Sequence, residues 1–477
     1  MDKVDVIVIG AGIGGLTSAL LLARQGVRVA LIEKQPYAGG CCSSFTASGY
    51  TFDACVDSIG GLGQGEALRR IMEEDLGIWD KVKFYDLAPI RRNFFPDFTI
   101  DIPVGLKAYE EALARIFPVE SNGIRQVLQR MEGIYQASTR SMLGESGGQE
   151  LIGYINMSLY DFLSSSVTDK RLHAVLSSYC TFLGVPADEV SAVIGANILM
   201  HYVRGGAFRV EGGFQKLADV MVEEIRRAGG DVSLGDAVIS IDNRAGYSVG
   251  TGVGRRIEGK FLLSNIALAK TLAMMGRNEN DRSQAALPSA EVSGSFVLLY
   301  LGLKGDLASS GIGSSAGYFG SYAFDDMLNG GSGAFAFGVS IPSLMDSSAA
   351  PAGHSALIAH WPTGSVRPVS LQERQRIAGQ MLDRLEQAVP GIRERVVYQS
   401  VSGPDTIERY TGNTAGAAYG WRQGRGLFKN LTALRKIAEN FHIVGHWSGY
   451  GGGVMPSMLS ACRAANTIIK QEDMSHG

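Results

Sequence analysis

The chain has 477 residues, of which 45% are hydrophobic and 19% charged, and its formal net charge is −3. This composition excludes an intrinsically disordered chain, and the length allows two domains. Because no run of basic residues is present, nucleic acid is not an expected partner.

Cysteine usage and hydropathy limit the expected cellular setting. The five cysteines form no Cys-x-x-Cys pair, so they predict neither a disulfide framework nor a zinc site, and no bound metal is expected. The first strand is predicted to begin at Val4 with no signal peptide before it, and no apolar run is long enough to predict a membrane span. We therefore expect a cytoplasmic protein with reduced thiols, for which peripheral contact with a membrane stays open.

The N-terminal segment is predicted to form a βαβ unit. Residues 4–9 are apolar and β-branched, as in a buried parallel strand, residues 16–24 indicate a helix, and residues 27–32 indicate a second strand. The first strand and the helix are joined by the motif Gly10-Ala11-Gly12-Ile13-Gly14-Gly15. In this context the glycine motif is the fingerprint of a Rossmann dinucleotide site, and it is far more specific than the same motif alone.

Each glycine of the motif has a physical role in such a site. Gly10 permits the tight turn, Gly12 lets the backbone approach a pyrophosphate, and Gly15 lets the helix pack closely on the strand. The helix N-terminus then offers unpaired N–H groups to the phosphates. Glu33, at the end of the second strand, is predicted to accept hydrogen bonds from the ribose hydroxyls of the adenosine.

The middle of the chain is predicted to be mostly helical. Residues 85–103 indicate short strands, residues 106–143 a long helix, and residues 153–204 an apolar helical region that breaks at Gly184-Val185-Pro186. The apolar region has two interpretations, an ordinary helical core or the wall of a pocket for an apolar substrate, and the first is the more common. Its large apolar residues are Met157, Leu159, Phe162, Tyr179, Phe182, Leu199, Met200 and Tyr202.

The second half of the chain mixes strands and helices. Residues 214–228 indicate an amphipathic helix, and strands at 238–241 and 261–264 are predicted to pair through a glycine-rich hairpin. The glycines of that hairpin follow no βαβ pattern, so no second nucleotide site is predicted there. The later elements are strands at 296–303, 356–360 and 442–445 and helices at 371–389 and 455–469.

Several further segments carry a resemblance to known families. Lys34 and the pair Gly39-Gly40 resemble the second glycine pair of flavoproteins in the glutathione-reductase-like superfamily. Residues 49–53, 407–421 and 445–454, in this order, resemble the phytoene desaturase and carotenoid isomerase group of FAD-dependent oxidoreductases. The resemblance implies bound FAD and a desaturase, dehydrogenase or isomerase that acts on a lipophilic polyene-like or natural-product substrate, as in carotenoid biosynthesis.

The resemblance also implies the fold class, α/β, with a Rossmann-type FAD-binding domain and a mixed α+β substrate domain. Flavin motifs lie at both ends of the chain, whereas the middle has none, so both domains are expected to be discontinuous. The FAD-binding domain is predicted to gather residues 1–85, 205–275 and 400–477, and the substrate domain residues 86–204 and 276–399.

The residues expected to contact the cofactor follow from the same resemblance. They are Gly10, Gly12, Gly14, Gly15, Glu33, Lys34, Gly39, Gly40, Val238, Gly445, Gly452, Gly453 and Val454. The glycines at 451–453 precede a predicted helix, whose N-terminus would stabilise the negative charge that reduction puts on the pyrimidine edge of a flavin. His446 stands where superfamily members often carry an Asp bonded to the ribityl chain, and His446 and Tyr450 are the candidate catalytic residues.

Cys41-Cys42 is a second departure from the pattern, because a basic or small residue often follows the glycine pair. A cysteine so near a flavin could be redox-active. A buried, inert thiol is the preferred interpretation, since no feature of the sequence indicates a lowered pKa.

Two other functions compete with the desaturase interpretation, and the first is a flavin-dependent amine or amino-acid oxidase. The segment Trp447-Ser448-Gly449-Tyr450 resembles flavin amine oxidases, in which this Tyr forms part of an aromatic cage for the amine. Their covalent flavin Cys has no counterpart, because Ala417 and Ala418 occupy that region, so FAD is expected to bind non-covalently. The third function is a binding protein similar to the Rab GDP-dissociation inhibitors, which bind no flavin, and the intact glycine motif argues against it.

Desaturation also needs a base for the proton on the neighbouring carbon. The candidates are His201, His360, His446 and Asp53, although each residue type is more often structural than catalytic. The pair Arg91-Arg92 could hold a substrate carboxylate or could be a solvated pair.

Overall fold

The computed structural model describes residues 2–476 apart from 245, 277–290, 324–326, 329–333, 365, 431–433 and 435–436. At its centre lies a five-stranded parallel sheet. The strand order is β11 (Asp231–Leu234), β3 (Val29–Glu33), β2 (Val6–Ile9), β15 (Phe261–Ser264) and β21 (Phe441–Ile443). All of β2 is buried, as a strand covered on both faces requires, and α1 (Ile13–Arg24) connects it to β3. The predicted βαβ unit and the α/β class are confirmed.

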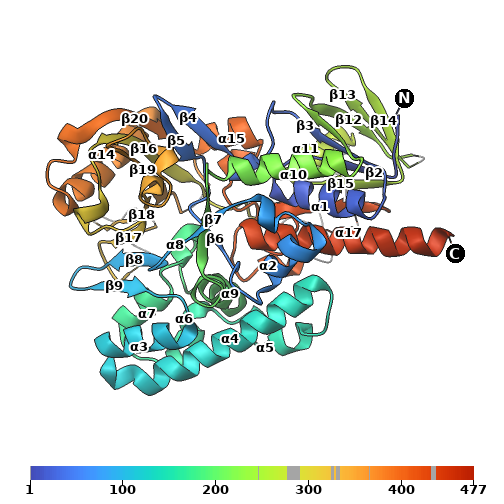
Figure 1. Ribbon diagram of the computed structural model, residues 1–477. Coiled ribbons are helices and arrows are strands. Elements are labelled where there is room, and N and C mark those ends of the chain that lie inside the picture. Colours follow the sequence, from blue (N-terminus) through green and yellow to red (C-terminus); the bar gives the residue numbers. More distant parts are fainter. Residues whose placement is uncertain are drawn as a thin grey trace.

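Helices cover one side of this sheet and a small antiparallel sheet covers the other (Figure 1). On the helical side, α1 packs against β2 and β3 and contacts α10 (Gln215–Arg227) and α17 (Val454–His476). The small sheet is the meander β12 (Val238–Asp242), β13 (Tyr247–Thr251) and β14 (Arg256–Gly259), extended by β1 (Asp2–Lys3). It approaches closely at Gly259, where a Cβ atom would lie 2.9 Å from Cγ1 of Ile7.

The predicted hairpin between residues 238–241 and 261–264 is wrong. β12 pairs with β13 and β13 with β14, whereas residues 261–264 form β15 of the parallel sheet. The strand β13 escaped prediction because serine and glycine, which are weak strand formers, alternate with its buried residues.

The second large sheet of the protein has seven strands. Its order is β20 (Val396–Ser402), β16 (Phe296–Lys304), β19 (His354–Pro362), β18 (Ala336–Ser340), β17 (Ser315–Phe319), β8 (Arg91–Phe94) and β9 (Thr99–Ile102). The predicted strands at 296–303 and 356–360 are confirmed as β16 and β19, which pair over their whole length. The predicted helix at 371–389 is α14 (Leu371–Ala388), whose buried residues share one core with this sheet.

The region below the two sheets is helical, while short strands, among them β6 (Ile59–Gly60) and β7 (Phe84–Asp86), lie between the sheets (Figure 1). The predicted helix at 106–143 is in fact two, α3 (Leu106–Ile116) and α4 (Ser121–Leu143), because Pro118 lacks the N–H that would continue α3. The predicted break at Gly184 is confirmed, since this residue ends a helix in the left-handed region. The other helices here are α5 (Ile152–Ile155), α6 (Leu159–Ser164), α7 (Lys170–Leu176), α8 (Cys180–Leu183) and α9 (Ala192–Val203).

Short elements complete the part of the chain that the structure describes. They are α2 (Ala67–Arg70), α11 (Leu268–Met274), α15 (Pro404–Thr411), β4 (Ser44–Ala47), β5 (Tyr50–Asp53), β6 (Ile59–Gly60), β7 (Phe84–Asp86) and β10 (Ala207–Val210). Within the described residues, no helix has the length and apolar character that crossing a membrane requires. The division into two discontinuous domains stays a prediction.

Candidate functional site

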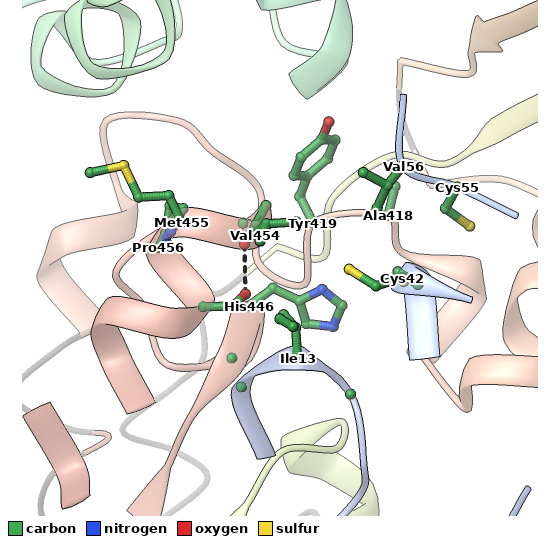
Figure 2. Close-up of a pocket in the computed structure, with 18 of the residues that line it drawn as sticks. Ile13, Cys42, Cys55, Val56, Ala418, Tyr419, His446, Val454, Met455 and Pro456 are labelled. Atoms are coloured by element: carbon green, nitrogen blue, oxygen red, sulfur yellow. Dashed lines mark hydrogen bonds between the residues drawn. The ribbon is translucent and has the colours of Figure 1, made fainter. Parts of the chain in front are cut away.

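A cavity of about 560 Å³ opens where the strands β2, β3, β15 and β21 end. Figure 2 shows the His446 ring in it, with Ile13 of α1 below, Tyr419 above, and the start of α17 opposite Cys42. Most of the predicted cofactor residues line this cavity. They are Gly10, Gly12, Gly14, Glu33, Gly39, Gly40, Gly445, Gly452, Gly453 and Val454, together with His446 and Tyr450.

Three predicted residues lie outside the cavity wall. Gly15 packs under the turn, where a Cβ atom would stand 2.0 Å from the Gly10 carbonyl oxygen, which is the packing role predicted for it. Lys34 donates from Nζ to the Arg409 carbonyl over 3.2 Å. Val238 begins β12 and pairs with Thr251 in the meander.

The glycine turn forms a cradle with free donors. Gly10 has a φ of 93°, and α1 begins at Ile13 with no side chain capping its N-terminus and no acidic residue in its first turn. The first N–H groups of α1 therefore have no partner in the helix, and they border the cavity. Such an end attracts an anionic group, and a pyrophosphate matches it.

Glu33 closes the end of the cavity next to this turn. Its Oε2 accepts from Ala11 N over 2.8 Å, and its Oε1 accepts from Gln35 N over 2.9 Å. Burial raises the pKa of Glu33, and the hydrogen bonds from Gln35 and Ala11 oppose that rise. Each carboxylate oxygen keeps a second lone pair for a ribose hydroxyl.

Asn265, just beyond β15, is a site residue that the sequence analysis missed. Its Nδ2 donates to the Gly10 carbonyl over 3.3 Å. A Cβ atom on Gly14 or Gly445 would come within 2.6 and 2.2 Å of its Oδ1. Asn265 thus supports the turn from beneath, and a lone Asn with no motif around it could not have been found from the sequence.

His446 is held by a second missed residue, Asn413. Asn413 Nδ2 donates to the Ala417 carbonyl over 2.9 Å, so its Oδ1 accepts from His446 Nε2 at 3.2 Å and from Trp447 Nε1 at 3.1 Å. This network assigns the His446 proton to Nε2 and leaves a lone pair on Nδ1. Burial lowers the pKa of His446 to about 4, so the ring is neutral at pH 7.

The glycines before α17 bring its N-terminus to the cavity. Gly451 and Gly453 have φ values of 108° and 100°, which other residues rarely adopt. A Cβ atom on Gly452 would lie 2.5 Å from Cβ of Tyr419, so the two segments pack backbone to side chain. Val454 and the two residues after it line the cavity at the start of α17 (Figure 2).

The other three candidate bases differ in their surroundings. Asp53 also lines the cavity, but its carboxylate is engaged by an ion pair with Arg209 and by hydrogen bonds from Ser44 Oγ at 2.6 Å and Phe214 N at 2.9 Å. His201 and His360 both line the cavity. Burial lowers their pKa values to about 3 and about 4, which keeps both rings neutral.

The pair Arg91-Arg92 is not placed to hold a substrate carboxylate. Neighbouring residues of a strand point to opposite faces, and Arg92 binds Asp101 through two hydrogen bonds of 2.6 and 2.8 Å. Arg91 is buried over the Phe182 ring, 4.5 Å from its centroid, and lies outside the cavity wall.

The helical wall of the cavity bears out each of the two interpretations of residues 153–204 in part. Among the eight large apolar residues singled out in the region 153–204, only Phe182 and Tyr202 line the cavity, so the ordinary-core interpretation holds for the other six. The rest of the helical wall comes from α4, α5 and α9 and from the turn between α4 and α5, so α5 and α9 of the region 153–204 also contribute to it. Besides Tyr202, its apolar members there are Tyr135, Met142, Leu151, Ile155, Val193, Ile194 and Ile198.

The buried histidine predicts a pH dependence of stability. The pKa of His446 is about 4 in the folded protein and about 6.5 in an unfolded chain. Between these values the unfolded chain binds a proton that the folded protein excludes, so the free energy of unfolding falls as the pH is lowered through this window. In His446→Asn, proton uptake on unfolding near pH 5 should be smaller by about one. Urea unfolding of wild type and His446→Asn from pH 4.5 to 8 gives the free energy of unfolding as a function of pH, and the slope of this curve measures the proton uptake. Equal slopes for the two proteins would contradict the lowered pKa of His446.

Comparisons with known proteins agree with this geometry. The model of the family described as flavin containing amine oxidoreductase matches residues 13–469. The chain is 29% identical to an all-trans-retinol 13,14-reductase of Danio rerio over 255 residues, which are 48% of this chain and 41% of that protein. It therefore spans less than half the length of this relative. It is 28% identical to an all-trans-zeta-carotene desaturase of Myxococcus xanthus, with 98% and 93% of the two chains covered.

A solved structure supports the fold at lower identity. A putrescine oxidase bound to putrescine has a TM-score of 0.67 and 14% identity, with 99% of each chain covered. Because the family model spans nearly the whole chain, from the start of α1 into α17, the chain belongs to the flavin-containing amine oxidoreductase family.

Proposed function

We propose that the protein is an FAD-dependent desaturase, dehydrogenase or isomerase of a lipophilic, polyene-like substrate. One observation carries the proposal: a single cavity joins the glycine cradle at α1 to the apolar wall formed by α4, α5 and α9. A dinucleotide and an apolar molecule can therefore lie in contact in the same space, with His446 and Tyr450 at its wall.

The residues present fit FAD. The uncapped N-terminus of α1 suits the pyrophosphate, and Glu33 suits the adenosine ribose. The lone pair on His446 Nδ1 can accept from a ribityl hydroxyl, where relatives use an Asp. The N-terminus of α17 suits the pyrimidine edge of the ring. Bound there, FAD supplies the hydride acceptor, while the chain positions the substrate and excludes water.

The cofactor is expected to be non-covalent FAD, because alanines occupy positions 417 and 418. Acid precipitation of the purified protein should leave a yellow supernatant whose mass is that of FAD. A colourless protein, a flavin mononucleotide in the supernatant, or flavin retained in the pellet would each contradict this expectation.

The substrate class follows from the wall. Burying apolar surface gains about 25 cal/mol per Å², so a long polyene could bind without a charged anchor. The three histidines in the wall, His201, His360 and His446, are neutral at pH 7 and present no cation to it. The names of the relatives, a retinol reductase and a carotene desaturase, point to the same class of polyene.

Amine oxidation is the second candidate, and one observation favours it. Tyr419 lines the cavity together with Tyr450, so two aromatic side chains are available where the sequence analysis found one. Asp57, also in the wall, has a buried Oδ1 that accepts no hydrogen bond in the described part of the chain, and this atom, 3.6 Å from Nη1 of Arg209, could accept from an ammonium group.

Product analysis separates the two candidates. The flavin-loaded protein is incubated in air with all-trans polyenes in one series and with primary and secondary amines in another, and the products are chromatographed. We expect desaturated or isomerised polyenes and unchanged amines. Aldehyde or ketone products from the amines, with every polyene recovered unchanged, would reverse the assignment.

A further inference from the structure

Three of the five cysteines border the cavity. Cys41 and Cys42 belong to a 3-10 turn that follows Gly39, and Cys55 lies two residues beyond β5. The other two, Cys180 and Cys462, are buried and lie outside the cavity wall. Cysteine is thus gathered at the one place in the protein where a flavin is expected.

The ladder between β4 and β5 brings two of these thiols together. Ser44 pairs with Asp53, and Ala54 N donates to the Ser43 carbonyl over 2.9 Å, so the two segments leave the ladder side by side. Beyond it, Cys41 and Cys55 lie within reach of each other, and the pKa of each thiol responds to the other. Cys41 Sγ also lies 4.0 Å from Nδ2 of Asn413, the residue that holds His446.

The two thiols are chemically unequal. The interaction with Cys55 lowers the pKa of Cys41 against the opposing effect of burial. The same interaction raises the pKa of Cys55, so Cys41 is the thiol that ionises first and Cys55 keeps its proton. Burial raises the pKa of Cys42, which makes this neighbour inert. The lowered pKa that the sequence analysis could not detect is thus created by the pairing.

We propose that Cys41 and Cys55 form a dithiol–disulfide couple that exchanges an electron pair with the flavin. The couple rests on the proposed flavin site. In oxidation of the pair, two S–H bonds break and one S–S bond forms between the Sγ atoms, and two electrons and two protons pass to the oxidised flavin. In the reverse direction the two-electron-reduced flavin restores both thiols. Cys55 is exposed to the cavity, so a small dithiol that enters the cavity can reach the disulfide and supply the flavin with electrons.

An anaerobic reductive titration tests the couple. The flavin-loaded protein, first oxidised with oxidised glutathione and desalted, is titrated with dithionite. Wild type is expected to take up about four electron equivalents per flavin, two for the ring and two for the disulfide, and Cys55→Ser about two. The matched control is Cys42→Ser, which removes the neighbouring thiol but not the pair, and it should still take up about four.

A peptide map provides a readout that needs no variant. After the same oxidation, blocking of free thiols and digestion, a peptide linked through Cys41 and Cys55 is expected, and it should disappear after the titration. Flavin-loaded wild type that takes up only about two equivalents, or lacks this peptide, contradicts the couple and leaves the proposed function intact. A protein that binds no flavin contradicts the proposed function, while the map still decides whether the two thiols pair.

Discussion

Replacing Arg209 by methionine is expected to lower the free energy of unfolding by about 3–5 kcal/mol. Arg209, on β10, and Asp53, at the end of β5, form an ion pair whose side chains are only 5% and 3% exposed. Arg209 also donates to the Ser340 hydroxyl at 2.6 Å and to the Asp57 carbonyl. Methionine would leave the Asp53 carboxylate buried without its cation, and an uncompensated buried charge is among the most costly defects of a folded protein.

Urea unfolding of the flavin-loaded protein measures this loss as a lower midpoint. The double variant Arg209→Met with Asp53→Asn removes the unpaired buried charge and should recover part of the lost stability. A double-mutant cycle of these two substitutions measures how much is recovered. Arg244→Met is the surface control, because its ion pair with Asp242 lies in water and should contribute nothing measurable. If Arg209→Met unfolds at the same urea concentration as Arg244→Met, the buried pair has no structural role.

Glu33→Arg is expected to weaken FAD binding by about 10- to 200-fold, which corresponds to the 1.5–3 kcal/mol of a charge-assisted hydrogen bond. The change removes the acceptor predicted for the ribose hydroxyls. It also leaves Ala11 N and Gln35 N without the carboxylate that now accepts from both, and this loosens the turn that carries Gly10 and Gly12.

Fluorescence titration of the deflavinated protein with FAD measures the effect. Glu33→Gln is the matched control, because it keeps one oxygen acceptor of the same size and should lose less affinity than Glu33→Arg. Titration with flavin mononucleotide, which has no adenosine, should give the same affinity for wild type and Glu33→Gln. Unchanged FAD affinity in Glu33→Arg would show that Glu33 does not lie at the ribose.

The central part of the fold could be predicted because its constraints are local in sequence. A buried parallel strand needs a continuous apolar run, and the glycine turn needs specific residues at fixed spacing. The sequence therefore predicts the strands at residues 4–9 and 27–32 and the glycine turn after Ile9. The helix end before Pro118 and the strand β13 were missed because their local signals are weak: one proline within a long helical pattern, and a strand in which serine and glycine alternate with buried residues.

The cavity wall could be predicted only in part, because it depends on contacts between distant segments. Asn413 is 33 residues from His446, and Cys41 and Cys55 meet only because β4 and β5 pair. Neither relation has a spacing that a single sequence reveals. The same limit explains why Tyr202 lines the cavity while its neighbour Met200 lies in the core, since which face of α9 turns inward is set by packing.

The central claim is that the flavin of this protein reacts with the carbon skeleton of a polyene rather than with an amine. Anaerobic mixing of the flavin-loaded, oxidised protein with each substrate panel tests it directly through the absorbance of the oxidised flavin. We expect the band to bleach with at least one polyene, or the recovered polyene to be isomerised without bleaching, and to persist with every amine. Rapid bleaching by a simple amine, with all polyenes neither bleaching the flavin nor changed on chromatography, would contradict the account.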